Sequence, residues 1–235
     1  PIRIYGAPNI AELDLSPMAS RLAVVTISNV YDKALGTHLT KLIVGASGVN
    51  NTQVSEISGL RQATLLGYLD VQGMQALTSL DLSAQLYFKT LKAHNTNIAS
   101  VTFAKGAPVS RLELPSSMRV LSLEQLPSLD SANIVMENLD WTNVLTITIK
   151  DCPNVSNDFG FIYNWVMANR ERMGDLTLTM NSVDWSGISG AQLAEVARVG
   201  KIEITGKVKL TDITAEQGEL FTSVWGDTIY DETAE

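Results

Sequence analysis

The sequence is poor in cysteine, in aromatic side chains and in charge. Cys152 is the single cysteine among 235 residues, so it cannot form an internal disulfide and the fold does not depend on an oxidising compartment. Aromatic residues make up 6% and charged residues 18% of the chain, against 45% hydrophobic residues. The hydrophobic residues never form a run of the roughly 18 that a membrane-spanning helix needs. They suffice for the core of one elongated domain or two compact ones.

Basic side chains are scarce in the last third of the chain. Residues 1–150 contain 11 acidic and 11 basic side chains, whereas residues 151–235 contain 14 acidic and 6 basic ones. The whole net charge of −8 therefore lies in the last third. Because phosphate backbones repel a surface of this sign, we expect no nucleic-acid partner.

What the sequence does contain is a short repeat: an apolar residue, two spacers, an apolar residue, one spacer and a third apolar residue. Copies lie at Ile10-Leu13-Leu15, Leu22-Val25-Ile27, Leu39-Leu42-Val44, Leu66-Leu69-Val71, Leu77-Leu80-Leu82, Phe88-Leu91-Ala93, Ile98-Val101-Phe103, Val109-Leu112-Leu114, Met118-Leu121-Leu123 and Val144-Ile147-Ile149, with looser ones at Met173-Leu176-Leu178 and Val199-Ile202-Ile204. From Leu66 to Met118 they start 9 to 11 residues apart. That is half of the roughly 20 residues in a solenoid coil, so alternate copies should stack on the same sheet.

The repeat predicts which side chains form the core. The last two apolar residues of each copy face one side of a strand. We expect burial and stacking in register for Leu80, Leu82, Val101, Phe103, Leu121, Leu123, Ile147 and Ile149.

The spacing of the copies divides the chain into two parts of one domain, 1–235. Residues 1–126 should form strand-rich coils with an insertion loop near 47–61, and residues 127–235 longer coils that contain helices and a C-terminal cap. Apolar spacing and capping residues predict helices over 157–174, 189–200 and 214–225. The run 201–210 reads as two short strands around Gly206.

The repeat resembles that of leucine-rich repeat proteins, L-x-x-L-x-L-x-x-[N/C]-x-L. Cys152 and Asn181 occupy the Asn/Cys position of their copies, while other copies carry different residues there. The resemblance implies an irregular leucine-rich repeat, an α/β solenoid with a parallel β-sheet.

Longer phrases, such as NTNIASVTFAKGAPVSRLELPSSMRVLSL, resemble leucine-rich segments in large virion proteins of crAss-like phages, which infect gut Bacteroidales. In that family the module belongs to a tail, muzzle or baseplate polypeptide and is a structural or attachment element. Ile2 and Ile4 fit the last two apolar positions of a copy whose first position would precede Pro1. We therefore expect this chain to be a fragment of a longer polypeptide.

Few residues suggest chemistry. Cys152 is either a reactive thiol or a small buried side chain that bonds the backbone at a turn, and burial is the favoured interpretation. His38 and His94 are 56 residues apart without acidic or cysteine neighbours at ligand spacing, so we expect no metal site. No nucleophile elbow or phosphate-binding loop occurs. We expect no catalysis and no cofactor.

Two tryptophans stand in matched settings, Asp140-Trp141-Thr142 and Asp184-Trp185-Ser186. Exposed tryptophans beside carboxylates would suit glycan stacking. The favoured interpretation is that each tryptophan fills the core while its polar neighbours cap a turn.

Three functions remain open. The first is a non-catalytic structural or interaction module of a phage virion protein, located in the virion. The second is a module of a secreted or bacterial cell-surface protein that binds host protein or glycan, and the third is an enzyme. The partners would be other virion or surface proteins, or a host protein or glycan. The candidate interaction face is the regular sheet, and its selected residues are Thr78, Asp81, Thr102, Arg119 and Ser122. The full set of outward side chains, which is small and mostly uncharged, also includes Ser79, Ala99, Ser100 and Val120.

Overall fold

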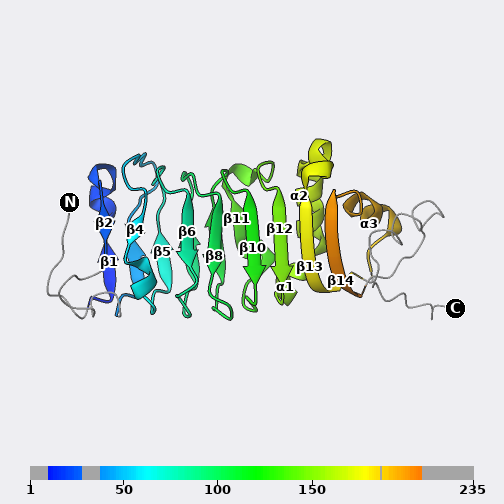
Figure 1. The fold of residues 1–235 in the computed structure, drawn as a ribbon, viewed down its shortest axis with the longest axis horizontal. Coiled ribbons are helices and arrows are strands. Elements are labelled where there is room, and N and C mark those ends of the chain that lie inside the picture. Colours follow the sequence, from blue (N-terminus) through cyan, green and yellow to red (C-terminus); the bar gives the residue numbers. More distant parts are fainter. Residues whose placement is uncertain (1–9, 28–37, 186, 208–235) are drawn as a thin grey trace.

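The chain forms an elongated stack of parallel β-strands (Figure 1). The computed structural model describes residues 10–27, 38–185 and 187–207. Two six-stranded sheets and one two-stranded sheet are found in these ranges. The arrangement is compatible with a repetitive, solenoid-like α/β fold.

Strands that are neighbours in a sheet come from successive coils of the chain. In spatial order, the first sheet contains β1 (Glu12–Asp14), β3 (Lys41–Ile43), β5 (Tyr68–Asp70), β7 (Thr90–Lys92), β9 (Arg111–Leu114) and β11 (Ile134–Met136). The second sheet contains β6 (Ser79–Leu82), β8 (Ser100–Phe103), β10 (Val120–Glu124), β12 (Thr146–Lys150), β13 (Thr177–Asp184) and β14 (Lys201–Lys207). The two-stranded sheet pairs β2 (Val25–Thr26) with β4 (Ile57–Ser58).

From β5 to β12, consecutive strands alternate between the first and the second sheet. One coil is therefore a pass through one strand of each. This confirms the prediction that alternate copies of the repeat stack on the same sheet.

The predicted register is also found. Leu80 lies opposite Val101, and Leu82 lies opposite Phe103. Leu121 lies opposite Ile147, and Leu123 opposite Ile149. Because side chains alternate along a strand, this register turns every pair to the interior.

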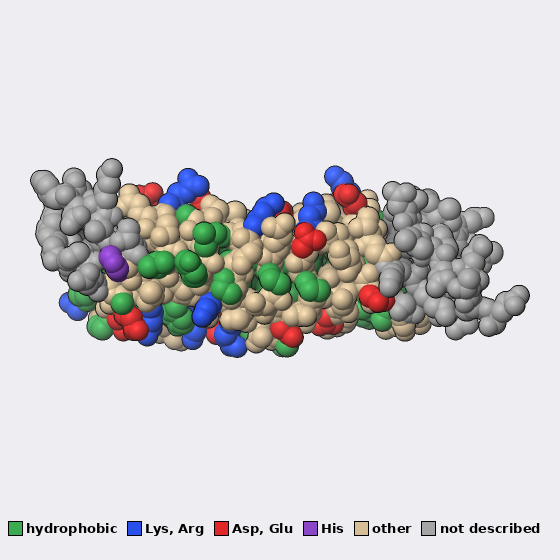
Figure 2. Space-filling view, turned by 90° about the horizontal axis from the view of Figure 1, so that it is seen from below, with side chains coloured by type: hydrophobic (Ala, Val, Ile, Leu, Met, Phe, Trp, Pro, Cys, Tyr) green, Lys and Arg blue, Asp and Glu red, His purple; other side chains and the backbone are tan. Residues whose placement is uncertain are grey.

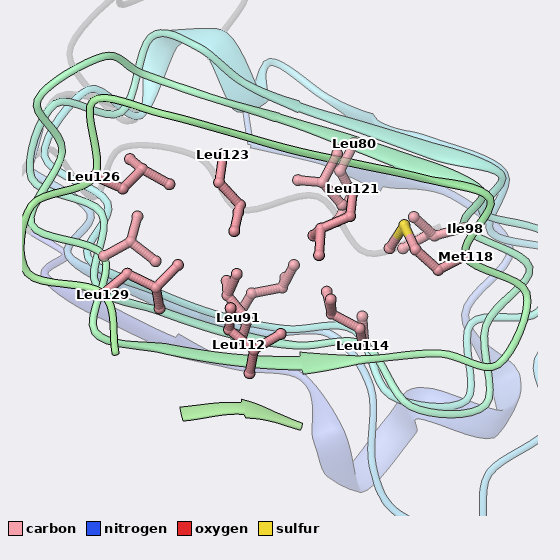
Figure 3. Close-up of a cluster of buried hydrophobic side chains, with 14 of the residues drawn as sticks. Leu80, Leu91, Ile98, Leu112, Leu114, Met118, Leu121, Leu123, Leu126 and Leu129 are labelled. Atoms are coloured by element: carbon pink, nitrogen blue, oxygen red, sulfur yellow. The ribbon is translucent and has the colours of Figure 1, made fainter. Parts of the chain in front are cut away.

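The core lies between the two sheets. Figure 3 shows Leu121 and Leu123 on one wall facing Leu91 and Leu112 on the other. The one predicted core residue that is not buried is Phe103, which is half-exposed, although its ring still packs 6.3 Å from that of Phe88. The next residue, Ala104, is buried instead.

The looser copy at Met173 is wrong by two residues. Ile147 lies opposite Leu178, and Ile149 lies opposite Met180. The run LTLTM has apolar residues at 176, 178 and 180. Two frames that differ by one side-chain period therefore look alike in the sequence, and only strand pairing separates them.

The change to helical coils comes later than residue 127. Residues 131–139 form two 3₁₀ turns, η3 (Ser131–Asn133) and η4 (Glu137–Leu139), on either side of β11. A 3₁₀ helix, η1 (Ser16–Arg21), already lies near the start of the described chain, and the α-helices of the described residues begin at α1 (Pro153–Ser156) and α2 (Phe159–Ala168). The sequence did not predict β11 because Ser131 stands where the repeat needs its first apolar residue.

Two of the three predicted helices are confirmed in shortened form. Asp158 caps α2 by accepting a hydrogen bond from the Phe161 N–H, and after residue 168 the chain continues as the 3₁₀ turn η5 (Arg170–Asp175). Ser189 caps α3 (Gly190–Val196) by accepting from the Gln192 N–H. The predicted helix 214–225 lies outside the described residues.

The insertion loop predicted near 47–61 is found only in part: residues 47–56 belong to no named strand, whereas the end of the segment forms β4 and the start of η2. Val54, Ile57 and Leu60 are buried. The spacing of Val54 and Ile57 fits the repeat. Its third apolar position is occupied by Gly59, which has φ of 84°, and the leucine follows one residue later, at Leu60.

The sequence predicts two short strands around Gly206 in the run 201–210. In the part that the structure describes, one strand, β14, continues through Gly206 to Lys207, and residues 208–210 lie outside the described residues. A β-bulge in β13 shifts the pairing there. Gly206 has φ of 146°, and a Cβ atom would lie 2.3 Å from the Val183 carbonyl oxygen. The glycine therefore allows close approach of two strands and does not end one.

Candidate interaction surfaces

The five residues predicted for an interaction face belong to or directly precede β6, β8 and β10. Thr78, Asp81, Thr102 and Arg119 are exposed, and Ser122 is half-buried. Asp81, Thr102 and Ser122 alternate with inward-facing leucine and valine, so they lie on the outer surface of the second sheet.

The same surface continues beyond the predicted residues as two rows of hydroxyl side chains. Thr146 lies opposite Thr177 in one row, and Thr148 lies between Ser122 and Thr179 in the other. Neighbouring strands place these side chains about 4.8 Å apart. The first row is interrupted by the exposed Val120, which lies between Ser100 and Thr146. The centre of the surface is therefore uncharged and mostly hydroxyl-bearing, with one apolar side chain.

Charged side chains lie at the margins of this surface. Asp81 pairs with Arg61 at 3.3 Å, and Glu124 pairs with Lys105 at 3.2 Å. Each exposed ion pair contributes roughly 0–1 kcal/mol. Hydrogen bonds from Ser83 hold the pKa of Asp81 below its usual value. The carboxylate thus stays charged at the end of the hydroxyl rows.

The first sheet has a charged outer surface, which sequence reasoning did not select. Lys41 pairs with Glu12 at 3.1 Å, and its Nζ atom lies 5.8 Å from the centre of the Tyr68 ring. Arg111 pairs with Glu113 at 2.8 Å within β9. These charged residues occupy spacer positions of the repeat, so the sequence shows that they face outward. It does not show which of them pair across strands, as Lys41 does with Glu12, because that depends on the strand register.

Asp70 is the least exposed carboxylate of the first sheet, at 7%. Burial raises its pKa, against the effect of hydrogen bonds from Gln72 and of the positive charge of Lys92. Gln72 donates to it from both its backbone N–H, at 3.0 Å, and its side chain. Asp70 and Glu113, which is 8% exposed, are therefore buried acids on this charged surface.

A third surface is formed by the turns that lead from the second sheet to the first. Figure 2 shows hydrophobic side chains gathered along the middle of this side of the molecule, with charged ones along its edges. Leu86 and Tyr87, in the turn between β6 and β7, are more than half exposed. This apolar stripe is a further contact surface that the sequence analysis did not identify.

Comparison of the chain with protein-family models, with curated proteins and with solved structures gives no match.

Loops at the carboxyl ends of the first-sheet strands surround a hollow of about 450 Å³. Glu137 reaches across it from η4. Its carboxylate accepts hydrogen bonds from the backbone N–H groups of Asn95, at 3.0 Å, and Ser116, at 3.2 Å. His94 also lines this hollow, and its buried Nε2 atom has no hydrogen-bond partner among the described residues. The Glu137 carboxylate thus links η4 to the loops that follow β7 and β9.

Cys152 is fully buried, as its favoured interpretation predicts. Its Sγ atom accepts a hydrogen bond from the Leu126 N–H and donates one to the Lys150 carbonyl oxygen, both at 3.3 Å. Burial raises the pKa of the thiol. Because a thiolate is the nucleophilic form, this environment makes the cysteine unreactive.

Asn181 does not occupy the position equivalent to Cys152. Met180 lies opposite Ile149, so Asn181 corresponds to Lys150 in the strand register. Its side chain exchanges two hydrogen bonds with Asp151, donating at 2.9 Å and accepting from the backbone N–H at 2.7 Å. Asn51, which the repeat did not select, is a buried asparagine, 2% exposed. Its Nδ2 atom donates to the carbonyl oxygens of Ala19 and Leu22, both at 2.7 Å, and so joins two coils.

The two histidines lie in different settings. His38 is exposed, and His94 is half-buried beside the 450 Å³ hollow. Within the ranges that the structure describes, no three side chains of His, Cys, Asp or Glu are grouped as metal ligands. No helix in those ranges is long and apolar enough to cross a bilayer.

The tryptophans divide between core and surface. Trp185 is 1% exposed, and its Nε1 atom donates to the Ser156 carbonyl oxygen at 2.9 Å. Trp141 is half-buried and packs edge-on against Phe161, with ring centres 5.1 Å apart. The prediction of a core role is confirmed for Trp185. Asp140 accepts hydrogen bonds from Thr142, as the predicted turn cap requires.

Proposed function

We propose that the chain is a leucine-rich repeat solenoid that serves as a non-catalytic structural or interaction module of a phage virion protein, such as a tail or muzzle polypeptide. The observation that carries the proposal is the outer surface of the second sheet. Six parallel strands present side chains in rows, and the centre of the surface is occupied mainly by serine and threonine, with Val120 among them. Stacked repeats use such rows of outward side chains to bind extended partners.

Two further observations support this assignment. The sequence phrases resemble leucine-rich segments of virion proteins, and strand pairing follows the repeat that carries the resemblance. Cys152, at the Asn/Cys position of its copy, is fully buried and accepts a hydrogen bond from the backbone N–H of Leu126 in the preceding coil. This is the role that the Asn/Cys position has in a leucine-rich repeat.

The alternative function is a module of a secreted or bacterial cell-surface protein. The observation that favours it is the accessibility of two aromatic rings, the half-buried Trp141 and the exposed Tyr87, because such rings are common in sites that bind glycan or protein. Both functions use surfaces and need no catalytic group.

The test is the location of the native polypeptide. Phage particles and cell envelopes from one infected culture are purified separately, and tryptic peptides of residues 10–207 are counted in each by mass spectrometry. We expect the peptides in the particles, at a constant ratio to the capsid protein across a density gradient. Peptides found in envelopes of uninfected cells, and absent from particles, would establish the alternative.

A further inference from the structure

The second sheet is interrupted at its β6 end. β4 pairs with β2 and β6 pairs with β8, but β4 and β6 do not pair with each other. They are neighbours along the stack, and β5 of the other sheet is seen between them in Figure 1. On the first sheet the corresponding coils are joined, because β3 and β5 pair over three residues. The coils thus pair along the first sheet. On the other side β4 and β6 stay unpaired with each other, and the coils are joined before and after these strands by the Asn51–Met74 bridge and by the bonds from Gln85 to Leu60 and Ala63.

A hollow of about 620 Å³ lies in this interruption, with walls from residues 55–62 and from Leu77 to Asp81. Its size is within the range of pockets that bind ligands, about 300–1,000 Å³. Buried side chains of Leu60 and Leu80 belong to the two walls. One exposed ion pair, between Arg61 and Asp81 at 3.3 Å, joins the walls.

The hollow has a fixed cause in the sequence. Gly59 has φ of 84° and starts the 3₁₀ turn η2 (Leu60–Gln62), so the strand ends after two residues. Gln85, which is fully buried, then holds the turn from behind. Its Nε2 atom donates to the carbonyl oxygens of Leu60, at 2.8 Å, and Ala63, at 3.3 Å. The opening is therefore preformed, and a segment that enters it displaces only the exposed Arg61–Asp81 ion pair, at a cost of roughly 0–1 kcal/mol.

Two unpaired strand edges face this hollow. An edge strand presents backbone N–H and C=O groups that are ready to pair with another chain. Proteins that bind extended peptides use such edges, where the main chain gives affinity and the side chains give specificity. Ser79, Leu80 and Asp81 of β6 line one wall, and Ile57 and Ser58 of β4 line the other.

The charges of the hollow select the partner. Asp81 is paired with Arg61, whereas the Glu56 carboxylate has no cationic partner among the described residues and accepts only a hydrogen bond from Ser58. An arginine or lysine of a bound segment would neutralise it.

We propose that the hollow between β4 and β6 is a strand-addition site, which binds an extended segment of a partner protein that carries an arginine or lysine opposite Glu56. The proposal rests on the proposed function as an interaction module and names its partner class. The segment pairs with the edge of β6 over about four residues and completes the second sheet at its interruption.

The test uses the whole chain and a defined peptide. The probe is an acetylated, amidated copy of residues 119–124 with Glu124→Gln, RVLSLQ, because β10 already forms parallel pairs and Arg119 supplies the cation. The control peptide has the same sequence with its four central backbone nitrogens methylated, which removes hydrogen-bond donors and keeps the side chains. Fluorescence anisotropy measures affinity, and hydrogen exchange locates the bound peptide.

We expect the unmethylated peptide to bind at least about tenfold more tightly than its methylated copy, since several backbone hydrogen bonds are lost in the latter. Exchange should slow in Ile57–Ser58 and Ser79–Leu82 and stay unchanged in β8 and β12. Glu56→Gln should weaken binding about two- to fivefold. The matched variant Glu124→Gln, whose carboxylate lies on the same surface but pairs with Lys105, should leave affinity unchanged.

Three results would overturn the site: no binding at millimolar peptide, equal affinity of the methylated copy, or slowed exchange at the β1, β11 or β14 edges in place of β6. None of them bears on where the native polypeptide is located. Particles that contain the chain, together with a peptide that fails to bind, would remove the site and leave the proposed function standing.

Discussion

The sharpest stability prediction concerns Asn51, which joins two coils from inside the molecule. Its amide nitrogen donates to the Ala19 and Leu22 carbonyl oxygens, and its Oδ1 atom accepts from the backbone N–H groups of Gln53, at 2.8 Å, and Val54, at 3.0 Å. The side chain is 2% exposed. Asn51→Asp keeps the shape and the acceptor but removes both donors and places a negative oxygen against two carbonyl oxygens.

The expected loss follows from these contacts. A buried polar group left without its partner costs about 1–3 kcal/mol, and two carbonyl groups lose theirs. We expect Asn51→Asp to lower the free energy of unfolding by about 2–6 kcal/mol. With a urea m-value of about 3 kcal/mol/M, the unfolding midpoint should fall by about 0.7–2 M.

The dependence on pH gives a second measure of the same variant. Burial beside carbonyl oxygens should raise the pKa of the new carboxyl in the folded state, and a protonated carboxyl can again donate one hydrogen bond. Stability linked to a raised pKa is present below the unfolded value, about 3.9, and is lost as pH rises through the folded value. The deficit of Asn51→Asp should therefore shrink as the pH falls towards about 4.

The control is Asn50→Asp, which makes the same change on an exposed neighbour whose Oδ1 atom accepts from Gln75 and Asn95. Its acceptor is retained, so its urea midpoint, followed by circular dichroism, should match that of the parent within about 0.2 M, since surface changes cost at most about 0.5 kcal/mol. If Asn51→Asp also unfolded with the parent, the bonds between coils assigned to Asn51 would be wrong.

Leu121→Asp should cost several kcal/mol because it buries an unpaired charge, while Ser122→Asp on the outer surface should cost little; equal thermal midpoints would refute the register. Gly200→Ala places a Cβ atom 2.1 Å from a carbonyl oxygen and should speed hydrogen exchange in β14, whereas Gly187→Ala has nothing within 4 Å and should not. Asp70→Asn should raise the urea midpoint at pH 7, because burial raises the pKa of this acid and its charged form therefore opposes folding. That advantage should vanish below about pH 3.9, where the carboxyl is protonated in both states, and a constant advantage at all pH values would refute it.

The sequence predicts that strands stack in two sheets, because each copy of the repeat marks one strand and successive copies are half a coil apart. Leu80 and Leu121 are selected as core residues by spacing alone, and both are buried. The pattern fails where a position is occupied by the wrong residue type. Gly59 and Ser131 stand at apolar positions of the repeat, so β4 and β11 cannot be recognised from the pattern. Both strands still form, because each can pair with a neighbouring strand despite one missing apolar side chain.

Surfaces are harder to predict than the core. The polar residues between apolar positions show which side chains lie outside, and Thr102 and Arg119 are exposed as predicted. Pairing between distant residues, such as Arg61 with Asp81, depends on where the backbone turns. The interruption between β4 and β6 follows from one glycine and one buried glutamine, and neither is distinctive in the sequence.

The most direct measurement of the central claim is a methyl NOE spectrum of the chain labelled on its isoleucine, leucine and valine methyl groups. The stacked register predicts contacts along one ladder, from Leu80 to Val101, then from Leu121 to Ile147, Leu178 and Ile202. These contacts join residues that are 21 to 31 positions apart. An NOE network in which Leu121 contacts Val109 or Leu112 as its sheet neighbour, and not Ile147, would contradict the account.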